Sequence, residues 1–116
     1  MLEDEDGTAE HLHVLLTTPS LAGEVVTVSI STRRPKSEAL VCLKPEEHPF
    51  ITRESVCPYR FAKIRSCKAI EAAIANGTAR SKEPASEDLV AKLAAGLIDS
   101  DFAPPGIRAF YLGVTS

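Results

Sequence analysis

Apolar and polar positions alternate along several stretches of the first 67 residues, which is the pattern of half-buried β-strands. The alternation is clearest in a segment rich in β-branched residues, where Val26, Val28 and Ile30 share one face. Proline, glycine and charged residues separate these stretches and indicate turns between them. We expect strands at residues 11–17, 24–32, 39–43 and 60–67.

From residue 68 the spacing of apolar residues changes to that of amphipathic helices. Ile70 and Ile74 share a helical face, which predicts a helix over residues 68–76. A second helix is predicted over residues 87–99, because Ser86 is a good N-cap and acidic residues follow it. Strands followed by helices indicate an α+β fold, with a small, strongly bent antiparallel sheet or partial barrel and helices at one end.

The composition of the chain is that of one globular domain. The chain has 116 residues, of which 44% are hydrophobic and 25% charged, so collagen and wholly disordered chains are excluded. Residues 1–9 are acidic and small, and we expect a disordered tail there, followed by one domain over residues 10–116. No stretch is apolar enough to span a membrane or to act as a secretory signal, so a cytoplasmic location is expected.

The three cysteines are odd in number and lack the spacing of metal-binding or disulfide-rich modules. Cys42, Cys57 and Cys67 form no C-x-x-C pair. Reduced thiols in the core are the simplest interpretation, and Cys57 is the one thiol predicted to lie in a loop. We therefore expect neither a metal site nor another cofactor.

Charge is distributed unevenly along the chain. The first ten residues carry five acidic side chains and no basic one. Residues 31–68 carry nine basic and four acidic side chains, a local excess of five positive charges. A basic surface of this kind favours a partner that bears phosphate, although a solvated surface of mixed charge is the alternative interpretation.

Histidines near a hydroxyl and several cations make up the most specific chemical pattern. His11 lies in the first predicted strand, His48 in the irregular loop before Pro49, and Thr32 at the end of the second strand. One histidine can take the proton of a ribose 2′-hydroxyl while the other protonates the leaving oxygen, which is metal-free RNA cleavage. We assign catalysis to His11, His48 and Thr32. Phosphate contacts are assigned to Arg33, Arg34, Lys44, Arg53 and Tyr59.

Other interpretations of these residues stay open. Each histidine can be a structural, half-buried residue, and a zinc site built on the His-x-His pair at His11 and His13 is a further alternative. Arginines at a turn are commonly solvated, and Thr32 is a common choice for a strand end. Motifs of P-loops, dinucleotide-binding turns, serine hydrolases and zinc proteases are absent from the sequence.

The order of these segments resembles that of the PemK/MazF-like toxin family. The similarity is carried by HLHVLLT at residues 11–17, by VTVSIST at 26–32 and by AKIRSC at 62–67, which runs directly into a helix. The segment LKPEEHPFI at 43–51 is similar to a feature of divergent members. The resemblance covers roughly residues 10–98. It implies an SH3-like barrel and a ribosome-independent endoribonuclease that acts as a homodimer.

By place, the family's threonine after the second strand corresponds to Thr32. The arginine that opens the family's first strand is replaced by His11, which implies a changed mechanism or an inactive barrel. The resemblance thus predicts a toxin of a toxin–antitoxin pair that cleaves single-stranded RNA and binds an antitoxin protein. A non-catalytic SH3-like module that binds nucleic acid, or an adaptor that binds a protein segment, is the alternative. The apolar segment at residues 107–112 is a further reason to expect a homodimer.

Overall fold

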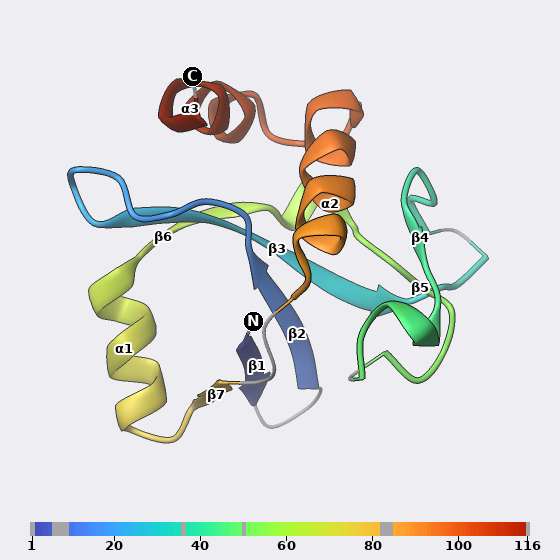
Figure 1. The fold of residues 1–116 in the computed structure, drawn as a ribbon, viewed down its shortest axis with the longest axis horizontal. Helices are drawn as coiled ribbons and strands as arrows, with labels where there is room; N and C mark the ends of the chain where they lie inside the picture. Colours follow the sequence, from blue (N-terminus) through green and yellow to red (C-terminus); the bar gives the residue numbers. More distant parts are fainter. Residues whose placement is uncertain (1, 6–9, 36, 50, 82–84, 116) are drawn as a thin grey trace.

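The protein has an α+β fold with an antiparallel sheet and three α-helices (Figure 1). The computed structural model describes residues 2–5, 10–35, 37–49, 51–81 and 85–115. The strands are β1 (Leu2–Glu5), β2 (Glu10–Leu15), β3 (Glu24–Thr32), β4 (Cys42–Leu43), β5 (Ser55–Val56), β6 (Lys63–Ser66) and β7 (Ala79–Ser81). The helices are α1 (Cys67–Ala75), α2 (Glu87–Asp99) and α3 (Pro105–Thr115), with 3₁₀ turns η1 (Pro45–Glu47) and η2 (Tyr59–Phe61).

The long strand β3 organises the sheet. It pairs with β2 along one side, whereas on the other side its first residues pair with β6 and its last two with β5. The strand order is β4-β5-β3-β2-β1-β7, with β6 beside the start of β3. Among the described strands the two ends of this order do not pair, so the sheet is open. The expected antiparallel sheet is confirmed, and closure into a barrel is not seen.

Each face of β3 packs against a different helix because successive side chains point to opposite faces. Val26, Val28 and Ile30 join the main core, which Leu93 and Leu97 of α2 complete. On the opposite face, Val25 packs with Ile70 of α1 in a smaller core. Figure 1 shows α2 and α1 on the two sides of β3. The alternation read from the sequence therefore sets the layer order.

Several predicted elements are confirmed. The segment at 24–32 is β3, and residues 87–99 form α2, whose cap Ser86 accepts a hydrogen bond from the amide of Leu89. The helix expected over 68–76 is α1, shifted by one residue towards the N-terminus. The strand expected over 11–17 is β2, which ends at Leu15.

Other expectations need correction. The predicted strand at 39–43 shrinks to β4, because β5 offers only two residues for pairing. The stretch at 60–67 begins as the 3₁₀ turn η2 and becomes a strand only at Lys63. No helix was predicted beyond residue 99, and the apolar segment at 107–112 lies inside the helix α3, where Ile107, Phe110 and Tyr111 pack on the core.

The acidic N-terminal segment is not wholly unstructured. Residues 2–5 form β1, which pairs with β2 on one side and with β7 on the other. Backbone hydrogen bonds on both sides hold this strand, and they do not depend on side-chain type. Residues 1 and 6–9 of the expected tail lie outside the described residues. No helix in the described part of the chain has the length and apolarity needed to cross a bilayer.

Candidate functional site

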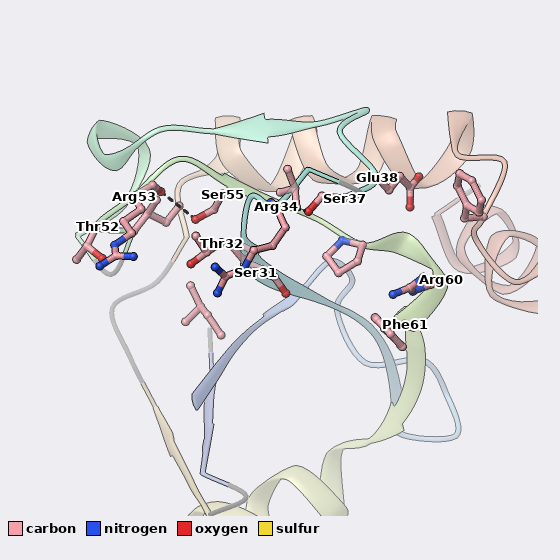
Figure 2. Close-up of a pocket in the computed structure, with 16 residues that line it drawn as sticks. Ser31, Thr32, Arg34, Ser37, Glu38, Thr52, Arg53, Ser55, Arg60 and Phe61 are labelled. Carbon is pink, nitrogen blue, oxygen red and sulfur yellow. Dashed lines mark hydrogen bonds between the residues drawn. The ribbon is translucent and has the colours of Figure 1, made fainter. Parts of the chain in front are cut away.

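A pocket of about 560 Å³ opens where β3 ends (Figure 2). Its walls come from the last residues of β3, the loop at 34–38, the segment at 51–56, the turn η2 and the residues that follow α2. These segments meet because β5 and β6 pair with opposite ends of the same edge of β3, and η2 connects them along the chain. The pocket therefore lies where the sheet divides.

Three arginines lie around this pocket. Figure 2 shows Arg53 at one end beside Thr52, Arg60 at the other end beside Phe61, and Arg34 between them near Thr32. None of the three guanidinium groups forms an ion pair within the described residues. The Arg60 guanidinium lies 4.6 Å from the centre of the Phe61 ring, which is a cation–π contact. Three arginines against one acid, Glu38, among the described lining residues give the pocket a net positive charge.

Short loops hold two of these arginines in place. The Arg34 amide donates to Ser37 Oγ at 2.8 Å, and the Ser37 amide donates back to the Arg34 carbonyl at 3.0 Å. The Ser55 hydroxyl donates to the Arg53 carbonyl at 2.9 Å. Pro35 favours the turn because its ring fixes φ. The backbone of Arg34 and Arg53 is therefore fixed before any ligand arrives.

Glu38 is the acidic residue of the pocket wall, and its carboxylate is engaged within the protein. Oε1 accepts from the Tyr59 amide at 3.0 Å, and Oε2 accepts from the Ser100 hydroxyl at 2.5 Å. Glu38 thereby joins the loop after β3 to η2 and to the end of α2. Its role is to hold the wall together, because hydrogen bonds inside the protein already occupy both oxygens.

Aromatic side chains and hydroxyl groups complete the lining. Phe61 and Phe102 are 52% and 63% exposed, which is unusual for residues of this size. Hydroxyl groups come from Ser31, Thr32, Ser37, Thr52 and Ser55. The arrangement offers cations for phosphate, flat apolar faces for stacking, and hydroxyls for hydrogen bonds.

Three of the residues predicted for the site come together in this pocket, namely Thr32, Arg34 and Arg53. Arg33 and Lys44 do not line it. The Arg33 guanidinium pairs with Glu54, with an Nη1–Oε1 distance of 2.5 Å, and this hydrogen bond raises the pKa of Arg33. Lys44 is exposed beside η1. The side chain of His11 lies outside the described residues.

Two assignments from the sequence are corrected by burial. His48 is only 4% exposed and does not line the pocket, so it is not positioned to exchange a proton with a phosphate bound there. Tyr59 is fully buried, and its hydroxyl donates to the Leu93 carbonyl at 2.7 Å. Both side chains are buried, and Tyr59 belongs to the main core, so neither is a surface contact for RNA.

The two phenylalanines of the pocket were not anticipated from the sequence. Phe61 follows Arg60 in a stretch interpreted as an alternating strand. A basic residue next to an aromatic one is the sequence feature that could have indicated a nucleic-acid contact here. Phe102 lies after α2, far along the chain from the other lining residues, and no local pattern connects it to them. Only the docking of α2 brings Phe102 to the pocket.

Metal and thiol chemistry find no support in the described residues. No group of three or more His, Cys, Asp or Glu side chains within them is placed to hold a metal ion. Cys57, the thiol expected in a loop, is fully buried, and burial raises its pKa to about 12. A thiol with such a pKa stays protonated at neutral pH and is a poor nucleophile.

Comparisons with models of known families, with curated proteins and with solved structures find no match for this chain.

Proposed function

We propose that this protein binds single-stranded RNA in the pocket at the end of β3. The observation that carries the proposal is the placement of Arg34, Arg53 and Arg60 around one pocket that also exposes two phenylalanines. Guanidinium groups bind phosphate oxygens in a fork, and exposed aromatic rings stack on unpaired bases. Glu38 is the one acid among the described lining residues, and both its oxygens accept hydrogen bonds from within the protein.

Single strands fit this pocket better than a duplex does. Its volume of about 560 Å³ is in the range of small-ligand pockets, and stacking on Phe61 and Phe102 needs bases that are free of a partner strand. The hydroxyl groups of Ser31, Thr32 and Ser37 can pair with the ribose 2′-hydroxyl. We therefore expect RNA to bind more tightly than DNA of the same sequence.

The test is fluorescence anisotropy with a labelled 12-nucleotide oligouridine and the variants Arg34→Gln, Arg53→Gln and Arg60→Gln. Each variant should weaken binding about fivefold or more, because a charge-assisted hydrogen bond to phosphate is lost. The slope of log affinity against log salt should fall by about 0.7 for each arginine removed. Lys44→Gln is the matched control, since it removes one positive charge outside the pocket and should leave affinity and slope unchanged.

The proposal fails if wild-type protein does not bind the oligonucleotide, or if all three arginine variants bind like Lys44→Gln. Phe61→Ala and Phe102→Ala give an independent check of stacking. Each should weaken binding by about 1–3 kcal/mol, the usual contribution of one stacked base. Thermal unfolding of every variant would show whether the fold is kept.

RNA cleavage is a second candidate function, and the position of Thr32 is the observation that favours it. Thr32 stands where the PemK/MazF-like resemblance puts a functional threonine, and it lines the same pocket as Arg34 and Arg53. His48 is buried and does not line this pocket, so it cannot act there as the acid–base partner of His11. A denaturing gel of the bound RNA tests cleavage. Products ending in a cyclic phosphate and lost in Thr32→Val would support it, and intact RNA at saturating protein would contradict it.

The proposal includes the prediction, drawn from the PemK/MazF-like resemblance, that the protein is the toxin of a toxin–antitoxin pair. The way β3 pairs with β2 on one side and with β5 and β6 on the other supports a divergent, open form of an SH3-like barrel. If the protein is such a toxin, we expect it to form a homodimer and to bind an antitoxin protein. An acidic antitoxin segment would compete with RNA for the same arginines, and competition is measurable in the anisotropy assay.

A further inference from the structure

A second pocket, of about 420 Å³, lies on the face of the sheet that α1 covers. It is lined by residues of β2, β6, α1 and β7, whereas the first pocket opens at the end of β3 on the α2 side. The antiparallel register puts three basic residues on this face, because directly paired residues point the same way. The pairs are Arg65 with Val25, Lys63 with Thr27 and His13 with Ser29.

The lining of this second pocket is basic on one side and apolar on the other. His13, Lys63 and Arg65 supply the basic groups, and Ala69 and Ala73 of α1 supply apolar surface. No aspartate or glutamate is among the described residues that line it. Positive charge here is therefore not balanced from within the pocket, and a negatively charged ligand is favoured.

One side chain of this pocket has a donor without an acceptor in the described part of the chain. The Nε of Arg65 is buried and has no hydrogen-bond acceptor within the described residues. A buried donor without an acceptor is costly, and native proteins satisfy nearly all of them. Nε can meet a phosphate oxygen only when the Arg65 side chain shifts towards the pocket, because less than 1 Å² of this atom is accessible. After that shift the guanidinium can donate two hydrogen bonds to phosphate, and Lys63 adds a further donor.

We propose that this second pocket binds a phosphate group through Arg65 and Lys63. The phosphate belongs either to a small phosphorylated molecule or to the backbone of a nucleic-acid strand, and both present the same oxygens. The site is separate from the pocket at the end of β3 and does not depend on the function proposed for that pocket. The proposal rests on the basic residues Lys63 and Arg65 in the lining and on the lack of an acid among the described lining residues.

The experiment is an NMR titration of the backbone amides of residues 63–66 in the isotope-labelled full chain. Inorganic phosphate, uridine monophosphate and the 12-nucleotide oligouridine are the three probes, and chloride at equal ionic strength is the blank. We expect saturable shifts at these amides. In Arg65→Gln and in Lys63→Gln the dissociation constant should rise about tenfold, whereas Lys44→Gln should titrate like wild type.

The probes distinguish the source of the phosphate. Saturation by inorganic phosphate or by the mononucleotide assigns the site to small phosphorylated molecules, and saturation by the oligonucleotide alone assigns it to a strand. Repeating the titration in Arg34→Gln separates this site from the first pocket, because the shifts at residues 63–66 should persist there. The proposal is overturned if none of the probes shifts these amides, or if Arg65→Gln and Lys63→Gln titrate like wild type.

Discussion

The buried thiol of Cys57 makes stability depend on pH in the alkaline range. Burial raises its pKa to about 12 from an ordinary value of 9.0. Between these pH values the unfolded chain has released a proton that the folded protein keeps, so the free energy of unfolding falls as pH rises. For this one group the decline is about 1.4 kcal/mol per pH unit.

Urea unfolding at a series of pH values from about 8 to about 10.5 measures this decline. In Cys57→Ala the free energy of unfolding should fall less steeply with pH. The decline that remains should begin above pH 10 and come from Tyr59, because burial raises the pKa of Tyr59 as well. An unchanged slope in Cys57→Ala would show that the thiol is not responsible. Alkylation offers a second readout, since Cys42 and Cys67 are half-exposed and should react before Cys57.

The neighbours Arg33 and Arg34 show where residue-level prediction from the sequence ends. Both were predicted to contact phosphate, yet Arg33 pairs with Glu54 and only Arg34 reaches the pocket. The strand pattern places the two arginines after β3 correctly. The partner of Arg33 depends on the pairing of β3 with β5, which brings Glu54 alongside, and no local spacing reveals that pairing.

At the level of elements, the contact between α2 and Tyr59 depends on Gly96. A Cβ at this position would come well within 3.0 Å of the Tyr59 hydroxyl and of Val41. Gly96→Ala should therefore destabilise the fold by about 1–3 kcal/mol, the usual cost of overpacking, and should disturb the Tyr59–Leu93 hydrogen bond. The urea midpoint measures this loss.

Gly113 in α3 is the matched control for Gly96. A Cβ there meets nothing within 4 Å, so Gly113→Ala should keep or raise stability, by up to about 1 kcal/mol from helix propensity. If both alanine variants change the midpoint alike, close packing at Gly96 is not the cause.

Elements with strong local signals were predictable, and elements defined by pairing were not. Helix α2 matches its predicted bounds because Ser86 caps it and Leu89, Leu93 and Leu97 give it a buried stripe. The strand predicted at 39–43 has suitable residues, but only Cys42–Leu43 finds a partner. The same limit applies to the site, whose arginines are visible in the sequence while Phe102 depends on how α2 docks.

For the whole molecule, a homodimer through the α2–α3 end stays a prediction. Ile107, Phe110 and Tyr111 pack on the core, but Ile98 and Leu112 remain exposed apolar residues of α2 and α3. Sedimentation velocity should show a dimer in the tens-of-micromolar range and a shift towards monomer in Leu112→Glu. Leu21→Glu, at a fully exposed turn position, is the control that should not shift the equilibrium. A monomeric wild-type protein would contradict the prediction.

The bond between Glu38 and Ser100 spans 62 residues, and this has a consequence for the protein during its synthesis. During synthesis, β3 and the loop at 34–38 leave the ribosome long before Ser100 and Phe102 do. Until α2 docks, one wall of the pocket is missing and Glu38 lacks one of its two partners. If the pocket binds RNA as proposed, the chain should gain that affinity only after α2 has docked and Ser100 has reached Glu38.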